Sequence, residues 1–369
     1  MYVNVKDFGA VGNGIVDDTA AIQAALTYAG NLYGGDITGV AGYVGWFTTE
    51  VIFPRGTYLC GKVIIPRRIK LKGCGQSVIK SLTGTSTVPA GFFVDNPIYT
   101  LYAKRLTFLY YDTCFRIPTN NSDMAFITFS ECSVAKTNLF VDTVSYAASR
   151  STTFRMERCH VSYGVKTLAK IYTDKSSFVG NWFLHSNDSI FMYLDSFAAF
   201  RDNMWIPVNA GPNKAYIEFN ASDLVRSLSF SSERFGGENG SCPIVIVRNV
   251  NAGGSNEAYR QQGVSFADCF ISSNSVYNPD GLESGVRACV VLRPSVSPLK
   301  SINYVDFKNC SLAPDLVGGV VQTYNVTDIS SLLPNCFTVN FDYISGVAAN
   351  KGINCPAGDD LTAYVRIPA

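Results

Sequence analysis

Three carboxylic acids, Asp202, Glu233 and Asp268, are the residues of this sequence whose type and spacing could do chemistry. Hydrolysis of a glycosidic bond uses two carboxyl groups: one protonates the leaving oxygen, and the other activates water or attacks carbon. The two groups stand about 5 Å apart in retaining enzymes and about 6.5 to 9.5 Å apart in inverting ones. The question is which scaffold would bring these residues to such distances.

Elimination from a polyuronate is a second possible chemistry. It needs a base beside a carbon-bound proton and a cation that neutralises the neighbouring carboxylate. The only two histidines of the chain are His160 and His185, and arginines occur in the same stretch at Arg158, Arg201 and Arg234. Because a lone histidine is more often structural, we prefer hydrolysis and keep elimination as the alternative.

A short pattern recurs from Phe129 onward and predicts the scaffold. An apolar residue is followed three positions later by Cys or Asn, or once by Glu, and two positions after that by another apolar residue. The copies are Phe129/Cys132/Val134, Met156/Cys159/Val161, Phe178/Asn181/Phe183, Phe200/Asn203/Trp205, Phe230/Glu233/Phe235, Phe266/Cys269/Ile271 and Phe307/Cys310/Leu312. A variable period is typical of a solenoid whose turns keep their strands but differ in one loop. The apolar columns then fill the interior, and the cysteines of the pattern are packing residues.

Glu233 occupies the central position where the other coils carry Asn or Cys. A carboxylate in such a column is costly unless it is paired, hydrogen-bonded or exposed through a widened loop. A glycine-rich segment, 236–240, follows it and contains Glu238. We therefore predict Glu233 as the first catalytic residue and Glu238 as a substrate contact; the alternative is a surface Glu that lies outside the register.

Asp202 and Asp268 stand just before the central positions of the coils that precede and follow Glu233. Adjacent coils are stacked about 4.8 Å apart, so a modest lateral offset would place either aspartate within catalytic range of Glu233. Asp202 with Glu233 is the preferred pair, and Asp268 with Glu233 is the second. Asp202 and Asp268 are two coils apart, about 9.6 Å.

The residues just after the central position should point outward if the columns on either side point inward. Among them we predict Trp182, Arg234, Phe270 and His160 as substrate contacts. Aromatic rings pack on the apolar faces of sugars, and a guanidinium binds the oxygens of an acidic sugar or an acetyl group. The same outward stripe would also suit a contact between protomers.

The N-terminal segment VNVKDFGAVGNGIVDDTAAIQAAL, residues 3–26, predicts a short strand, a glycine loop and a helix. Asp17 and Asp18 are placed where the helix should begin and are interpreted as helix caps. The apolar face of that helix should cover the open end of a stack of strands and consists of Ile22, Ala25 and Leu26.

A second segment, VIFPRGTYL at 51–59, contains a proline and a glycine that predict a turn between two strands. Together the two segments closely resemble the start of the pectate-lyase-like right-handed β-helices, a superfamily of polysaccharide-cleaving enzymes and bacteriophage tailspikes. The resemblance implies an all-β fold: a right-handed parallel β-helix over 51–320. It implies a strand, a capping helix and a loop in 1–50. The repeat stops after about residue 320, and the alternating segment 335–341 predicts a short C-terminal β element in 321–369.

The resemblance also implies a function. It favours a phage tailspike depolymerase, an endo-glycosidase that binds and hydrolyses a bacterial surface polysaccharide, either capsule or O-antigen. Such a protein would be a homotrimer joined through C-terminal β structure, and its other partners would be phage tail proteins. The alternatives are a polysaccharide lyase of the same fold and a non-enzymatic receptor-binding spike of the virion. We expect no cofactor and no metal, because the calcium-binding aspartates of true pectate lyases are not identifiable.

Composition argues against several other classes. The 30 Lys and Arg against 29 Asp and Glu leave no basic field for nucleic acid. Lys70 and Lys72 alternate with Ile69 and Leu71, which predicts a strand with one solvent-exposed face. Eleven cysteines without a C-x-x-C pair indicate neither a zinc ribbon nor a complete disulfide framework. With no leader and no membrane-spanning run, we expect production in a host cytoplasm, incorporation into the virion and action at the bacterial surface.

Overall fold

The protein is described by a computed structural model in which parallel β-strands dominate. The residues that the structure describes are 2–32, 49–66, 68–82, 91–94, 100–117, 125–143, 152–185, 190–207, 215–221, 227–236, 245–249, 263–271, 290–294, 304–312, 321–323, 338–342, 353–354 and 365–366. They fall into two compact units, unit 1 (Met1–Ser177) and unit 2 (Phe178–Ala369). Both are stretches of a right-handed parallel β-helix, as the sequence predicted.

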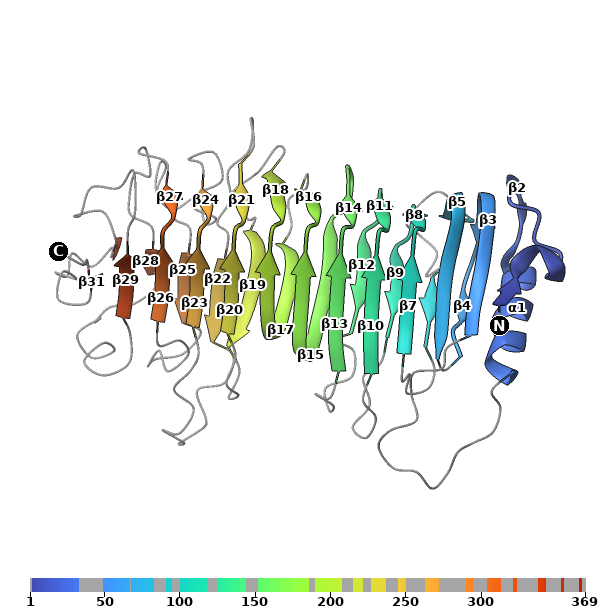
Figure 1. The fold of residues 1–369 in the computed structure, drawn as a ribbon, viewed down its shortest axis with the longest axis horizontal. Helices are drawn as coiled ribbons and strands as arrows, with labels where there is room; N and C mark the ends of the chain where they lie inside the picture. The colour runs from blue at the N-terminus through green and yellow to red at the C-terminus, as the bar shows by residue number, and fades with distance from the viewer. Residues whose placement is uncertain are drawn as a thin grey trace, which may run out of the picture. The chain divides into compact units, whose positions relative to one another are not determined.

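Unit 1 begins with a cap built around helix α1, Thr19–Asn31 (Figure 1). The predicted apolar face is confirmed, because Ile22, Ala25 and Leu26 are fully buried against the first strands. The two aspartates differ in what they bind. Asp17 Oδ1 accepts from the backbone N of Thr19 at 2.9 Å and thus caps the helix. Asp18 stands at the N-cap position, but its carboxylate binds the loop amides at 11 and 12 instead of the helix.

The predicted turn at residues 53–58 is wrong, because β3 (Thr49–Cys60) runs through it as one strand. Between Pro54 and Gly56 the pairing of β3 with β5 (Ile69–Ser81) shifts by one residue, as in a β-bulge. A bulge bends a strand without ending it, and it accommodates a proline that has no N–H to donate. Lys70 and Lys72 face outward from β5, while Ile69 and Leu71 are buried, as predicted.

The coils of unit 1 stack along three strand ladders, all of them parallel. The first ladder continues from β3 and β5 through β7 (Thr100–Lys104), β10 (Ala125–Ser130) and β13 (Thr152–Glu157). The second ladder is narrow and joins the end of β5 to β8 (Thr107–Leu109), β11 (Ser133–Ala135) and β14 (His160–Val161). The third contains β4 (Val63–Ile64), β6 (Phe92–Phe93), β9 (Thr113–Arg116), β12 (Leu139–Asp142) and the first part of β15 (Thr167–Val179).

Unit 2 repeats the same three ladders. The first contains the end of β17 (Ile190–Arg201), β20 (Ser227–Ser231), β23 (Gly263–Ala267), β26 (Tyr304–Lys308), β29 (Thr338–Asp342) and β31 (Val365–Arg366). The narrow one contains β16 (Trp182–His185), β18 (Met204–Pro207), β21 (Arg234–Phe235), β24 (Phe270–Ile271) and β27 (Ser311–Leu312). The third contains the start of β17, β19 (Ala215–Ala221), β22 (Val245–Asn249), β25 (Val290–Pro294), β28 (Val321–Thr323) and β30 (Ile353–Asn354). Parallel pairing therefore extends past residue 320, further than the sequence pattern does.

The predicted interior columns are confirmed in both units. In unit 2 the phenylalanines of the pattern stack face to face, with ring centroids 4.6 to 4.9 Å apart from Phe178 to Phe307. The spacing equals that of neighbouring strands, so each ring covers the one in the next coil. Among the described residues no helix is long and apolar enough to cross a membrane.

One sharp corner recurs between the first ladder and the narrow ladder in the coils from β7 to β26. Its backbone is left-handed, and most of the residues that occupy it are not glycine: Arg105, Glu131, Arg158, Asp202, Ser232, Asp268 and Asn309, with Gly180 in the same place. A left-handed residue costs free energy unless it is glycine or a short polar residue such as Asp or Asn. We call this set the corner column; the residue after each member is the central Cys, Asn or Glu of the pattern, except that Leu106 follows Arg105.

Candidate functional site

Glu233 lies inside the coil, with 1% of its surface exposed. Its Oε1 accepts from the backbone N and the Nδ2 of Asn203, at 3.1 and 2.9 Å. Its Oε2 accepts a short hydrogen bond, 2.5 Å, from the indole Nε1 of Trp205. Both oxygens therefore bind interior donors.

The residues around Glu233 explain why the column changes from amide to carboxylate there. In the preceding coil, Asn203 Oδ1 accepts from the backbone N and Nδ2 of Asn181, at 2.8 and 2.9 Å. An amide oxygen in each coil thus receives the donors of the coil before it. At the next coil the indole of Trp205 adds a further buried donor, and a buried indole N–H needs an acceptor. A carboxylate supplies two acceptor oxygens, whereas Asn would supply one.

Burial raises the pKa of Glu233 to about 7, although the hydrogen bonds from Trp205 and Asn203 act to lower it. The same burial keeps the carboxylate away from solvent and from a glycan on the outer surface. The catalytic role of Glu233 stays a prediction, and the described geometry favours a different one: Glu233 satisfies the interior donors of the preceding coil.

Asp202 and Asp268 lie on the outside, in the corner column of unit 2. Ser232 is the corner residue between them, so the two aspartates are two coils, about 9.6 Å, apart along the ladder. Asp202 Oδ2 lies 3.5 Å from the guanidinium of Arg201, and Asp268 Oδ1 accepts from the Nδ2 of Asn309 at 2.6 Å. The side chain of Asp202 points outward and that of Glu233 points inward. The catalytic pair preferred from the sequence, Asp202 with Glu233, is therefore not brought together.

The predicted outward stripe of unit 2 is present as one column. Strand register places Trp182 beside Met204, then Arg234, then Phe270. Trp182 and Phe270 are 42% and 46% exposed, and the guanidinium of Arg234 lies 5.8 Å from the ring centre of Phe270. Two exposed rings and a cation therefore flank the corner column that carries Asp202 and Asp268. Glu238 lies outside the described residues.

His160 occupies the equivalent outward column in unit 1, beside Ser133. It is exposed, and its corner neighbour is Arg158. The sequence prediction thus selected residues from the same position of the coil in both units. No group of three or more His, Cys, Asp or Glu gathers as a metal site among the residues the structure describes.

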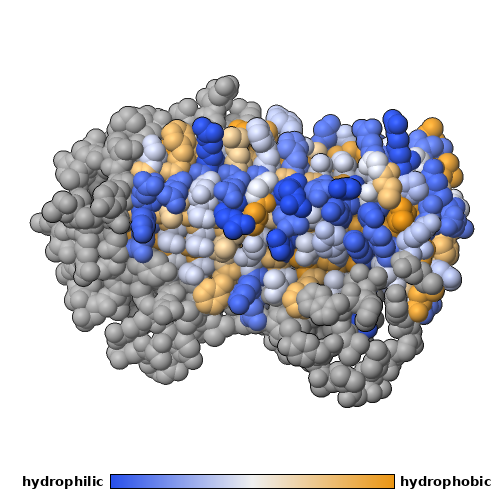
Figure 2. Space-filling model, viewed as in Figure 1, coloured by the Kyte–Doolittle hydropathy of each residue, from blue (hydrophilic) through white to orange (hydrophobic). Residues whose placement is uncertain are grey.

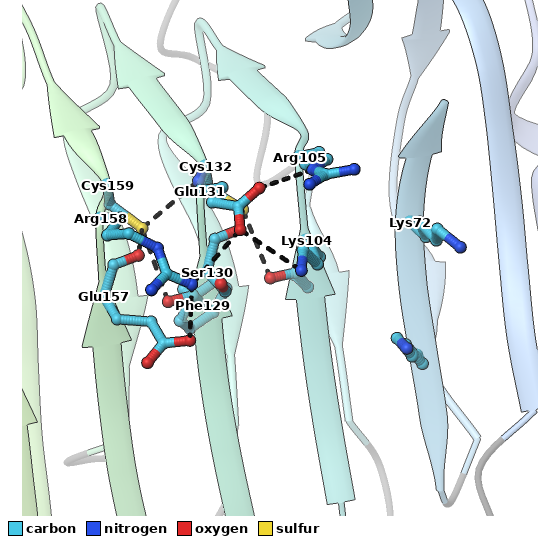
Figure 3. Close-up of polar contacts among 12 residues, drawn as sticks. Lys72, Lys104, Arg105, Phe129, Ser130, Glu131, Cys132, Glu157, Arg158 and Cys159 are labelled. Carbon is cyan, nitrogen blue, oxygen red and sulfur yellow. Dashed lines mark hydrogen bonds and ion pairs between the residues drawn. The ribbon is translucent and has the colours of Figure 1, made fainter. Parts of the chain in front are cut away.

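The sequence interpretation missed a charged cluster in unit 1, where Glu131 lies between two arginines of the corner column (Figure 3). Its carboxylate is 2.6 Å from Arg105 Nε, 3.3 Å from Lys104 Nζ and 3.3 Å from Arg158 Nη2. These cations lower the pKa of Glu131. The available signal was position: Glu131 and Arg158 directly precede Cys132 and Cys159, as Asp202 directly precedes Asn203.

The fold and the outward columns define a right-handed parallel β-helix of the pectate-lyase kind. The chain belongs to the family described as rhamnogalacturonase A/epimerase, pectate lyase-like, which matches residues 2–279.

Curated relatives match short segments. The non-secreted LysM effector LysM19 of Penicillium expansum is 45% identical over 65 residues, which are 18% of this chain and 5% of that protein. The mannuronan C5-epimerase AlgE1 of Azotobacter vinelandii is 60% identical over 37 residues, which are 10% of this chain and 3% of that protein. The chain thus spans a small part of the length of these relatives.

Solved structures match the whole fold. The A-module of the Azotobacter vinelandii mannuronan C-5 epimerase AlgE4 superposes with a TM-score of 0.56 at 15% identity, over 100% of both chains. The tailspike of E. coli bacteriophage HK620, in complex with a pentasaccharide, superposes with a TM-score of 0.57 at 12% identity, over 96% of this chain and 65% of that one. At these identities the likeness is one of fold.

Proposed function

We propose that the protein binds a bacterial surface polysaccharide along unit 2 and hydrolyses its glycosidic bonds, as a depolymerase of the tailspike type. The observation that carries the proposal is the outward column of Trp182, Arg234 and Phe270 beside exposed carboxylates in the corner column. Membership in a family described by a rhamnogalacturonase and an epimerase supports a polysaccharide as the substrate.

Asp202 and Asp268 form the proposed catalytic pair. Their spacing of about 9.6 Å lies at the upper limit for inverting enzymes, which need room for a water molecule between the sugar and the base. One aspartate would protonate the leaving oxygen while the other takes a proton from that water. Sugar faces would pack on Trp182 and Phe270, and Arg234 would bind an acidic or acetyl oxygen.

The proposal includes a place in a phage virion. We expect a homotrimer that is attached to other tail proteins and acts at the bacterial surface. A structural neighbour supports this expectation, since the HK620 tailspike, which is bound to a pentasaccharide, shares the fold.

The test is cleavage by single-site variants. Asp202→Asn and Asp268→Asn should each lower the rate of new reducing ends at least about hundredfold, the usual worth of a positioned acid or base. Asp306→Asn, on β26 and away from the corner column, is the matched control and should cleave at the wild-type rate. Substrates are polysaccharides from a panel of bacterial strains.

Two results would decide against the pair. If both aspartate variants cleave normally while a folded Glu233→Gln variant is inactive, the catalytic residue is Glu233. If the wild-type trimer cleaves no polysaccharide in the panel but binds one, the protein is a non-enzymatic receptor-binding spike.

Polyuronate elimination is the second candidate, and the exposure of His160 beside Arg158 favours it. The imidazole would take the proton next to the uronate carboxylate, and the guanidinium would neutralise that carboxylate. Products with the ultraviolet absorbance of an unsaturated uronate, lost in His160→Ala, would select this chemistry. Their absence from every cleavable polyuronate would remove it.

A further inference from the structure

Four cysteines of the interior column form two stacked pairs. In unit 1, Cys132 and Cys159 lie opposite each other, because the strands before and after them, β10 with β13 and β11 with β14, pair in register. In unit 2, Cys269 and Cys310 lie opposite each other in the same way, between β23 with β26 and β24 with β27. We call them the unit 1 pair and the unit 2 pair. In the described part of the chain, strand register places no other cysteine opposite a cysteine.

The spacing of each pair suits a disulfide bond. Residues opposite each other in neighbouring coils have the strand spacing, about 4.8 Å between their Cα atoms. A disulfide requires Cα atoms about 4.4 to 6.8 Å apart and Cβ atoms about 3.5 to 4.5 Å apart. A bond therefore needs only an approach of the Cβ atoms by a few tenths of an ångström, and the register of the strands can stay as it is.

The four thiols repeat one local geometry. Each Sγ lies 3.3 to 3.7 Å from two backbone carbonyl oxygens, one in its own coil and one in the preceding coil. Since a thiol is a weak donor, loss of its proton costs these contacts little. The Sγ of Cys159 also accepts from the backbone N of Cys132 at 3.4 Å, and a disulfide sulfur can still accept. The interior can therefore hold either the thiols or the disulfide.

The pairs are buried, but they lie directly beneath the surface. Each thiol is 1% to 2% exposed. The residues on both sides of Cys159, Arg158 and His160, are exposed, and Cys269 and Cys310 are flanked in the same way. Figure 3 shows the unit 1 pair on neighbouring coils, and Figure 2 shows hydrophilic side chains over β7, β10 and β13 on this side of unit 1. A local opening of the corner would thus admit a small polar oxidant.

One thiol of the unit 2 pair is prepared to react first. The hydrogen bond from the thiol of Cys269 lowers the pKa of Cys310, although burial acts to raise it. The thiolate is the reactive form of cysteine, so Cys310 would attack the oxidant and Cys269 would then complete the bond.

From the register, the spacing and the shallow burial we infer that each pair is a modification site, at which a peroxide forms a disulfide between neighbouring coils. One sulfur attacks a peroxide oxygen, the O–O bond breaks, and a sulfenic acid and one water form. The second sulfur displaces the sulfenic oxygen, which leaves as water with the second thiol proton, and the S–S bond forms. The two thiols lose two electrons in all, and the peroxide gains them.

The cross-link would close a covalent loop in each unit. The members of the unit 1 pair are 27 residues apart in sequence, and such a loop stabilises a fold by restricting the unfolded chain. A cytosol keeps thiols reduced, whereas the outside of a cell permits disulfides. The coils would thus be joined after folding and release. This timing rests on the proposed function, which places the protein at the bacterial surface; the cross-link itself does not.

The experiment treats the folded full chain with hydrogen peroxide, blocks the remaining thiols by alkylation and maps cross-linked peptides by mass spectrometry without reduction. The exposed Cys74 reports that the peroxide was active. Cys159→Ala removes the unit 1 pair, and Cys310→Ala removes the unit 2 pair. Cys114→Ala removes a buried thiol that lies opposite no cysteine and is the matched control. Circular dichroism checks that each protein stays folded during the treatment.

We expect one cross-link within each pair and a thermal midpoint that rises by at least about 3 °C on oxidation. Cys159→Ala should lose only the unit 1 cross-link, Cys310→Ala only the unit 2 cross-link, and Cys114→Ala neither.

Three results would overturn the inference: oxidation of Cys74 while both pairs stay as thiols, oxidation of the pairs to sulfinic acids without a cross-link, or cross-links from the pairs to Cys60 or Cys114. Because cleavage is not measured, failure here is distinct from failure of the proposed function. Asp202→Asn should accordingly form both cross-links.

Discussion

Units 1 and 2 use the same corner of the coil for opposite charges. In unit 1 the corner column carries Arg105, Glu131 and Arg158, whereas in unit 2 it carries Asp202, Ser232, Asp268 and Asn309. The whole units differ in the same direction: unit 1 has six more Lys and Arg than Asp and Glu, and unit 2, with 12 Lys and Arg against 17 Asp and Glu, has five fewer. The left-handed backbone of the corner column thus accepts residues of either charge. The charge of the corner residues can therefore differ between the units and determine which ligand each unit binds.

The interior column differs between the units as well. Cys132 and Cys159 occupy it in unit 1, where a thiol of one coil accepts from the backbone N of the coil before it at 3.4 Å. In unit 2, Asn181, Asn203 and Glu233 occupy it and form an ordered series of stronger hydrogen bonds; Cys269 and Cys310 follow them in the same column. Buried thiols tolerate loss of a partner, whereas buried amides and carboxylates do not.

The largest effect is therefore expected from removing Glu233. Glu233→Ala leaves three buried donors of Asn203 and Trp205 without an acceptor. At about 1 to 3 kcal/mol per unsatisfied group, unit 2 should lose about 5 kcal/mol of unfolding free energy. Cys159→Ala in unit 1 should lose about 1 kcal/mol, the usual size for a mild substitution. Urea unfolding, followed by tryptophan fluorescence and circular dichroism, measures both; equal losses would mean that the two columns do not differ energetically.

The unfolding free energy of unit 2 should depend on pH through Glu233, a group that unit 1 does not contain. The pKa of Glu233 is raised to about 7 from 4.5. Between these values the folded state holds a proton that the unfolded state has released, so stability falls as pH rises from about 4.5 to about 7 and is level above. The expected loss is on the order of 3 kcal/mol. Glu233→Gln does not titrate and is the control; a wild-type profile that rises over this window would contradict the assignment.

The smallest of these effects concerns the exposed rings. Trp182→Ala should weaken glycan binding to unit 2 several-fold, because a sugar face loses its aromatic partner. Unfolding free energy should change by less than about 0.5 kcal/mol, since the ring is exposed. Phe197→Ala removes another exposed ring of unit 2 and serves as the control. Isothermal titration with a bound oligosaccharide compares them, and an equal effect of both variants would remove Trp182 from the binding surface.

Much of the fold could be predicted from the sequence because the coils stack equivalent residues of the repeat on one another. The pattern Phe200/Asn203/Trp205 identified both apolar columns and the polar one between them, and register confirms all three. The inward orientation of the Glu233 side chain could not be predicted, since the sequence shows that the residue type changes in this column but does not show which residues bind it. Trp205 was the missing signal: two positions after Asn203 it must point inward, and its N–H then requires an acceptor.

The charged cluster around Glu131 could not be predicted from sequence for a different reason. The sequence pattern begins at Phe129, so it does not align Arg105 with Glu131 and Arg158. Their shared left-handed conformation shows that they belong to one column. The pairing of charges across coils depends on register, which composition cannot supply; a near-zero net charge over the whole chain concealed two units of opposite sign.

The polar series inside unit 2 has a direction, and this affects how the chain is completed during synthesis. Each coil supplies donors, and the acceptor comes from the coil that follows: Asn181 depends on Asn203, and Asn203 depends on Glu233, 30 residues later. A growing chain that has reached only Asn203 and Trp205 therefore holds donors whose acceptor has not yet been made. The last coil to emerge is always unfinished, and the Glu233 coil is where the amide series first becomes complete.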